Sequence, residues 1–171
     1  MSTVYTSITS LQDAIYDWLA PIVSPRQIIW RNQKAPQPTS AYYALDITSL
    51  AIAEGNGMEI QVSGSQRTLV QRRHAVLNLQ SFGAQATESL FDLKSFMYLE
   101  SSREALTAAN LAVLNDEDVL ELSALIDTDF QERASMDLLL GYTRSDLDGS
   151  NWIEIVEVTD TFGDTTIIDG S

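Results

Sequence analysis

The sequence predicts an α+β fold in which a mainly antiparallel sheet carries helices packed on one face. Predicted helices and strands fall into separate runs instead of alternating, and this order favours α+β over a doubly wound parallel sheet. Residues 67–82 and 130–144 alternate between apolar and polar side chains, as strands with one buried face do. Hydrophobic residues make up 44% of the 171 residues, which is ordinary for one globular domain.

An amphipathic helix is predicted over residues 7–23. Its apolar side chains recur every three or four residues and therefore share one face. They are Ile8, Leu11, Ile15, Trp18, Leu19 and Ile22. Thr9 or Ser10 is expected to cap the helix, and Pro21 and Pro25 are expected to mark its end.

Two strands are predicted on either side of a proline-rich linker. The first covers residues 27–31 and the second covers residues 41–52. In the second strand Tyr43, Leu45 and Ile47 alternate with Tyr42, Ala44 and Asp46. We call residues 32–40 the elbow. Pro36 and Pro38 exclude regular structure from the elbow and stiffen it.

The longest predicted strand covers residues 67–82 and follows two turns, at residues 54–58 and 62–66. Its apolar side includes Leu77 and Leu79, which we expect in the core, whereas its other side is mostly polar. Gly83 is expected to end this strand.

The second half of the chain is predicted to contain two helices and three more strands. The helices cover residues 86–99 and 102–110, and the strands cover residues 118–125, 130–144 and 152–158, with a turn at 146–151. Leu138 and Leu140 lie on the apolar side of their strand and complete the predicted core. We expect one α+β domain over residues 1–159 and a flexible acidic tail over residues 160–171.

The charge is −14, from 24 acidic against 10 basic residues. Binding to duplex DNA or to anionic lipid needs clustered basic side chains, so this charge disfavours both. Residues 113–129 hold six acids and no base, and residues 145–171 hold seven acids and no base. Two interpretations stay open, a solvated acidic surface and a surface that repels a passing polyanion.

The residues give no support to a catalytic or cofactor site. The chain has no cysteine, and its single histidine, His74, is interpreted as a surface or packing residue. Residues 146–154 resemble a calcium loop, but Arg144 and Ile155 would occupy its first and last ligand positions, so a turn is favoured. We therefore predict a protein that is not an enzyme and needs no cofactor or metal.

No targeting or membrane-spanning segment is predicted. The N-terminus lacks the basic start and apolar centre of a signal peptide, and no apolar run reaches the roughly 18 residues that span a bilayer. We expect a soluble chain that stays in the cytoplasm in which it is made. Of the three tryptophans, Trp18 is interpreted as a core residue, whereas Trp30 and Trp152 are candidates for contact with a partner.

Three stretches together resemble the neck or tail-terminator proteins of contractile-tailed bacteriophages. They are IIWRNQKAPQPTSAYYALDI from Ile28, RRHAVLNLQSFGAQATESLFDL from Arg72 and LIDTDFQERASMDLLLGYT from Leu125. The shared features are a tryptophan strand followed by Asn-Gln and a proline elbow, a basic-start strand ending in Phe-Gly, and an Asp-Thr segment before an Arg-Ala strand. The resemblance covers residues 11–158, and the C-terminus is more acidic than the family pattern.

The resemblance implies a structural virion protein that caps the tail and forms a ring, most simply a hexamer, at the head–tail junction. Its neighbours would be connector, collar, tail tube or sheath proteins, with DNA passing through without specific binding. The protein would be assembled in the host cytoplasm and would not contact a membrane. The alternative is a monomeric adaptor or a tail-assembly chaperone.

Two sets of residues are predicted to serve assembly. A subunit or partner interface would include Trp30, Asn32, Gln33, Pro36, Pro38 and Tyr42, with the elbow as a projecting arm and oligomerisation also through the polar face of the sheet. A plain surface loop is the alternative for the elbow. Acids lining the passage for DNA would include Asp116, Glu117, Asp118 and Glu121.

Overall fold

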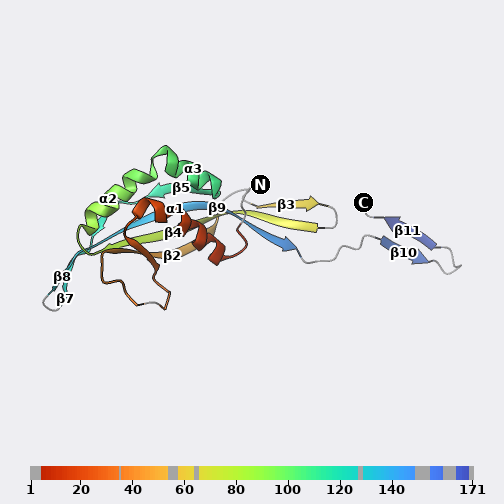
Figure 1. Cartoon of the computed structure of the whole chain (residues 1–171). Helices are drawn as coiled ribbons and strands as arrows, with labels where there is room; N and C mark the ends of the chain where they lie inside the picture. Colours follow the sequence, from red (N-terminus) through yellow and green to blue (C-terminus); the bar gives the residue numbers. More distant parts are fainter. Residues whose placement is uncertain are drawn as a thin grey trace.

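A seven-stranded sheet with three helices on one face forms the body of the molecule (Figure 1). The computed structural model describes residues 5–34, 36–53, 58–63, 66–126, 129–148, 155–159 and 165–169. Its strand order is β1-β2-β4-β9-β5, with β3 paired to β4 and β6 paired to β9. Every pairing in this sheet is antiparallel except that of β1 with β2, so the predicted α+β class is confirmed.

The helices and strands have the following bounds. The helices are α1 (Ile8–Val23), α2 (Ala86–Met97) and α3 (Glu100–Ala108). The strands of the sheet are β1 (Gln27–Trp30), β2 (Tyr42–Ile52), β3 (Met58–Ser63), β4 (Gln66–Phe82), β5 (Leu111–Asp116), β6 (Leu120–Glu121) and β9 (Arg133–Asp148). Two further hairpins join β7 (Ala124–Ile126) to β8 (Asp129–Gln131) and β10 (Ile155–Thr159) to β11 (Thr165–Asp169).

Helix α1 begins one turn earlier than its predicted caps. Ser7 is the N-cap, and its side chain and that of Ser10 exchange hydrogen bonds with each other's backbone amides in a capping box. The predicted caps, Thr9 and Ser10, therefore lie inside the first turn. Pro21 does not end the helix but lies in its last turn, and the helix ends at Val23.

The core lies between the helices and the sheet. Leu77, Leu79, Leu138 and Leu140 are all at most 1% exposed, which confirms their predicted place in it. Across β4 and β9, Leu77 pairs with Leu138, Leu79 with Met136 and Leu140 with Ala75. The apolar faces of the helices close the core from above. Their buried side chains include Leu11, Ile15, Trp18, Leu19, Leu90, Leu93, Met97 and Leu106.

The opposite face of the sheet carries a chain of polar contacts, and none of the described helices lies on it. Arg133 Nη2 donates to Gln80 Oε1 at 2.8 Å, and Gln80 Nε2 donates to Asn78 Oδ1 at 2.7 Å. Asn78 Nδ2 in turn donates to Ser135 Oγ at 3.0 Å and to the carboxylate of Asp137. Each of these side chains has at least one partner, so most of this half-buried polar face is satisfied, although Arg133 Nε is buried without a hydrogen bond.

Gly83 ends β4, as predicted, because the chain turns there with φ of +91°. A side-chain carbon at this position would lie 3.0 Å from Ala41 Cα, so only glycine fits this turn without strain. Its amide donates to the carbonyl of Glu132 at 3.0 Å, which fixes the end of β4 against the start of β9.

The second half of the sheet differs from the prediction in three places. Strand β5 was not predicted, because the bulge between Val113 and Asn115 interrupts its alternation. The strand predicted over residues 118–125 is instead the two-residue β6 followed by β7. The strand predicted over residues 152–158 was expected to pair back onto the preceding strand, but its described part, β10, pairs with β11.

The predicted division of the chain at residue 159 falls between the strands of the β10–β11 hairpin. The domain boundaries therefore stay a prediction. Trp152 lies outside the described residues, as do most of the predicted turn at residues 54–58 and parts of the predicted turns at 62–66 and 146–151.

Strand β3 and the strand ends beside it form an extension that we call the arm. It consists of β3, residues 66–72 of β4 and residues 143–148 of β9, and it runs on beyond the helices (Figure 1). The pairing of β4 with β9 continues without a break from Phe82 to Arg67, so the arm is a direct continuation of the central strands.

Candidate assembly surfaces

The elbow returns the chain between two parallel strands. Strands β1 and β2 pair in parallel with Gln27 opposite Tyr42 and Trp30 opposite Leu45. The chain must therefore run back along the whole of β1 before it can enter β2, a connection that usually takes a dozen residues or more. Pro36 and Pro38 favour the extended backbone that this return needs. The loop stands off the sheet below β2 in Figure 1.

A tight turn anchors the start of the elbow. The Gln33 amide donates to the Trp30 carbonyl at 3.1 Å, and the Gln33 side-chain oxygen accepts from the Trp30 amide at 3.2 Å. Arg31 lies 3.5 Å from the Asp46 carboxylate on the next strand. Trp30 itself is half-buried and packs against the core, so it anchors the start of the elbow to the body of the molecule.

Tyr42 anchors the end of the elbow and is itself buried. Its ring stacks on Phe82 with centroids 4.8 Å apart, and Arg133 lies 5.2 Å above the Phe82 ring. Its hydroxyl accepts a hydrogen bond from Gln37 Nε2 at 2.7 Å. Among the predicted interface residues, Asn32, Gln33 and Pro36 are exposed and Pro38 is half-buried. The exposed middle of the elbow is thus free to contact a partner, while Trp30 and Tyr42 hold its two ends.

The predicted lumen acids divide into one paired and three exposed carboxylates. Asp116 lies 2.6 Å from Lys94 Nζ and accepts a hydrogen bond from the Tyr98 hydroxyl. The hydrogen bond from Lys94, and after it that from Tyr98, hold the pKa of Asp116 below its ordinary value. The same contact raises the pKa of Lys94. Asp116 therefore joins the end of β5 to α2.

Replacing Asp116 with asparagine should lower the free energy of unfolding by about 1 kcal/mol at pH 7. Because the folded-state pKa of Asp116 is lowered, its contribution is present above the unfolded pKa and is lost as pH falls through the folded value. Urea unfolding at pH 7 and at about pH 3 should show the difference between wild type and variant shrinking at the lower pH. The exposed neighbour Asp118, changed to asparagine, is the control, and an equal loss at both pH values for Asp116→Asn would contradict this assignment.

Glu117, Asp118 and Glu121 remain exposed beside this ion pair. The Glu117 amide donates to the Asp137 carbonyl at 2.9 Å, and Glu121 lies in β6, opposite Ala134. The backbone is fixed while the carboxylates face outward. This arrangement places three exposed acids along one edge of the sheet.

The two predicted sets of residues lie at opposite edges of the sheet. The elbow joins β1 and β2 at one edge, and the acids follow β5 and β6 at the other. This separation depends on the strand order, which local sequence patterns do not predict. The two sets therefore do not form a single site within one chain.

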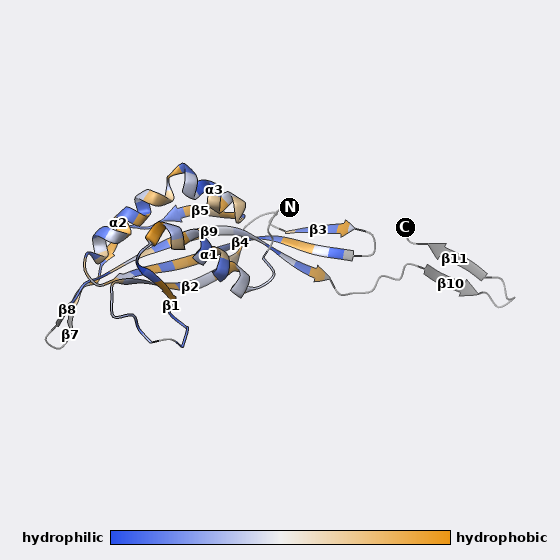
Figure 2. Ribbon diagram, viewed as in Figure 1, coloured by the Kyte–Doolittle hydropathy of each residue, from blue (hydrophilic) through white to orange (hydrophobic). Residues whose placement is uncertain are grey.

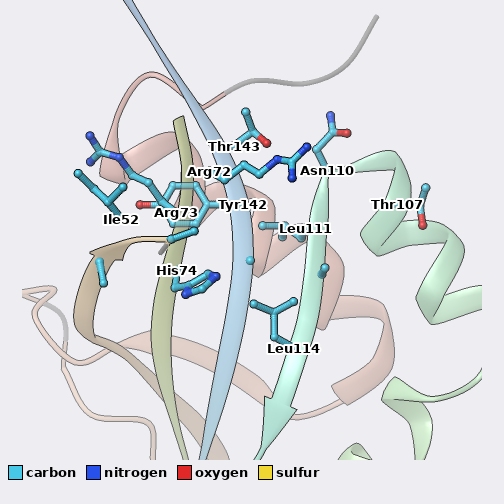
Figure 3. A pocket seen from close by; sticks show the side chains of 14 residues that line it. Ile52, Arg72, Arg73, His74, Thr107, Asn110, Leu111, Leu114, Tyr142 and Thr143 are labelled. Atoms are coloured by element: carbon cyan, nitrogen blue, oxygen red, sulfur yellow. The ribbon is translucent and has the colours of Figure 1, made fainter. Parts of the chain in front are cut away.

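A shallow hollow of about 870 Å³ opens on the sheet, and the only histidine of the chain contributes to it (Figure 3). Arg72 and His74 reach it from β4, Leu114 from β5 and Thr143 from β9. Gly141 makes room for Leu114, since an added side-chain carbon would lie 3.2 Å from it. His74 is half-buried, in accord with its interpretation as a surface or packing residue.

Within the described residues, no group of three or more histidine, aspartate or glutamate side chains could hold a metal ion. Among the described helices, none has both the length and the apolar character needed to span a membrane.

An apolar stripe that was not predicted lies exposed on the arm. Met58, Ile60 and Val62 alternate along β3 and are 54%, 62% and 58% exposed. The alternation in MEIQVS is a strand signal, but the segment is short and lies between two turn signals. In Figure 2 hydrophobic residues interrupt the hydrophilic ones along this arm, whereas the elbow is almost wholly hydrophilic.

A sequence model of the family described as phage neck terminator protein matches residues 9–170. The chain belongs to this family. The match covers nearly the whole chain and confirms the predicted resemblance to bacteriophage neck or tail-terminator proteins. A comparison with curated proteins found no match. Whether the phage has a contractile tail stays a prediction, as do the interface and lumen roles of individual residues in this neck terminator.

Proposed function

We propose that the protein caps the finished tail of a contractile-tailed phage and forms a ring, most simply a hexamer, at the head–tail junction. The observation that carries the proposal is the match of the neck terminator family to residues 9–170. The role is structural and involves no catalysis or cofactor. The protein assembles in the host cytoplasm and remains in the virion beside connector, collar, tail tube or sheath proteins.

The strand order is compatible with a ring. Elbow and acids lie at opposite edges of one sheet, so the two sides of each subunit present different surfaces. Contacts between two different surfaces are heterologous, and they close into a ring when the rotation between subunits allows it. The elbow then contacts either the next subunit or a neighbouring tail protein, through Asn32, Gln33 and Pro36.

Proline makes the elbow suitable for such a contact. A segment that is already stiff loses less conformational entropy when a partner orders it. Its two ends are held by the Gln33–Trp30 turn and by the Gln37–Tyr42 hydrogen bond. The exposed residues between these anchors would present their polar groups in a nearly fixed arrangement.

The exposed acids border the passage for DNA in this proposal. A wall that repeats several carboxylates around a ring has a negative potential and does not retain phosphates. Glu117, Asp118 and Glu121 suit this role better than Asp116, whose charge is compensated by Lys94.

Changing Glu117, Asp118 and Glu121 to lysine should leave particle assembly normal and slow DNA ejection, because a basic wall binds phosphate. The slowing should diminish as salt concentration rises. Ejection can be followed in purified particles by the fluorescence of a dye that binds released DNA. Asp13 and Asp17 on α1, changed to lysine, form a control with exposed acids elsewhere. Unchanged ejection in the triple variant would show that these acids serve solubility alone.

Depletion of the protein tests the function as a whole. When its synthesis is blocked during infection, tails should vary in length and fail to join heads, and electron micrographs give both quantities. Supplying the wild-type chain from a plasmid should restore a single tail length and head joining. Tails of normal length that join heads without the protein would contradict the proposal. Tails that fail to form at all would favour a tail-assembly chaperone instead.

A further inference from the structure

The apolar stripe of the arm continues the face that the helices cover in the body. The register of β4 runs unbroken through Arg67, Leu69 and Gln71 to Ala75 and Leu77, so all five face the same side. Met58, Ile60 and Val62 stand opposite Gln71, Leu69 and Arg67 on that side. On β2, Leu50 and Ile52 stand opposite Ala75 and Arg73 and are also exposed. The sheet thus carries its apolar face beyond the last helix, where no helix of this chain covers it.

A groove of about 480 Å³ lies on the outer side of the helix layer. Its floor includes Trp18, whose indole nitrogen donates to Ser102 Oγ at 3.0 Å, and its walls include Pro21 and Ile22. Phe96 and Leu99 line it and are 47% and 50% exposed. Large apolar side chains that line a groove and are half-exposed mark a surface that another apolar segment can cover.

The two surfaces differ in charge. The arm carries Arg67, Arg72 and Arg144 against Glu59, Asp146 and Asp148, so it is neutral within a chain whose net charge is −14. Helices α1, α2 and α3 are acidic. Their acids are Asp13, Asp17, Glu88, Asp92, Glu100 and Glu104, against Lys94 and Arg103. A neutral apolar arm can approach the acidic helices without net repulsion, whereas two helix layers repel each other, so charge favours contact between the unlike surfaces.

The arm of one chain does not cover the groove of the same chain. Figure 1 shows β3 leading away from α1, α2 and α3, and its apolar side chains are more than half exposed. A second copy can satisfy both surfaces, because its groove receives this arm while its own arm remains available for a third copy. Such a head-to-tail contact propagates around a ring.

We propose that the apolar stripe formed by Met58, Ile60 and Val62 docks in the Trp18–Phe96–Leu99 groove of a second copy of this chain. The inference rests on the proposed ring, and it identifies the surfaces that join adjacent subunits. The elbow is left for contact with another neighbour.

Disulfide trapping between two variants tests this contact, because the natural chain has no cysteine. Full-length Ile60→Cys is mixed with full-length Leu99→Cys under mild oxidation, and the covalent heterodimer is measured by denaturing electrophoresis without reductant. Glu59→Cys mixed with Leu99→Cys is the matched control, because Glu59 and Ile60 are neighbours on opposite faces of β3. Ile60→Cys mixed with Leu120→Cys is a second control, since Leu120 is an exposed leucine outside the groove. Circular dichroism confirms that each variant is folded.

The expected result is about tenfold more heterodimer from Ile60→Cys with Leu99→Cys than from either control, because a disulfide needs Cα atoms within about 7 Å. Light scattering measures oligomerisation in the same samples. Oligomers that form without preferential cross-linking would overturn the arm-and-groove contact and leave the proposed function intact. A chain that remains monomeric and uncross-linked at about 1 mM overturns it too, since self-association this weak does not support the contact. Cross-linking that appears only when tail tubes are added, and only to a tube protein, assigns the groove or the arm to that partner and also overturns the proposal.

Discussion

Replacing Leu77, Leu79, Leu138 or Leu140 with alanine should lower the free energy of unfolding by about 2–5 kcal/mol in each case. Each side chain is at most 1% exposed and lies between the helices and the two central strands. The substitution removes apolar contact and leaves a cavity that the rigid strands β4 and β9 cannot close. A loss of this size is a large fraction of the 5–15 kcal/mol that is typical of a domain.

Urea unfolding followed by circular dichroism measures these losses, and Leu139→Ala is the matched control. Leu139 lies between two of the core leucines but on the other face of β9, where it is half-buried. Its loss should be clearly smaller than that of Leu138→Ala or Leu140→Ala. A loss well below 1 kcal/mol at all four core positions would show that the buried faces of β4 and β9 had been wrongly assigned.

Deleting Lys34–Thr39 should leave the chain folded but abolish its assembly. The remaining residues between β1 and β2 are Arg31, Asn32, Gln33, Ser40 and Ala41. At about 3.3 Å per residue they reach roughly 16 Å. The return from Trp30 to Tyr42 spans only about 11 Å, from the rise of the strand and the spacing between strands. The parallel pairing can therefore persist, while the exposed surface of the elbow is lost.

A second variant separates the surface of the elbow from its length. Replacing Lys34–Thr39 with glycine and serine in equal number keeps the reach but removes the prolines and the partner-facing side chains. Assembly should be weakened, because a flexible segment loses more entropy on binding. Both variants are scored by the fraction of phage tails joined to heads, with thermal unfolding as the check of folding. Normal assembly of the deletion variant would exclude the elbow as an interface.

Local sequence patterns predicted the elements that depend on their own residues. The alternation from Arg67 to Phe82 and the helical spacing from Leu11 to Leu19 follow from single faces that meet the core, and both were confirmed. Strand β5 was not predicted because its bulge breaks the alternation. Strand β3 was not predicted although MEIQVS alternates, because this short segment lies between two turn signals.

Local patterns did not predict the features that depend on contacts between segments distant in the sequence. The parallel pairing of β1 with β2 explains why the elbow is long. Hydrophobic periodicity along the sequence carries no information on which strands pair or in which direction. The ion pair of Lys94 with Asp116 joins α2 to the end of β5, and these segments are separated in the sequence. Asp116 was therefore predicted to belong with the exposed acids. The opposite positions of the elbow and the acids likewise follow from strand order alone.

Reconstruction of the neck from images of intact virions would show whether the protein has the proposed place in the particle. We expect a closed ring of this chain between the head connector and the end of the tail. In that ring Asn32, Gln33 and Pro36 contact an adjacent subunit or a tail protein, and Glu117, Asp118 and Glu121 face the channel. A junction that lacks the chain, or a chain present there as an isolated copy, would contradict the account.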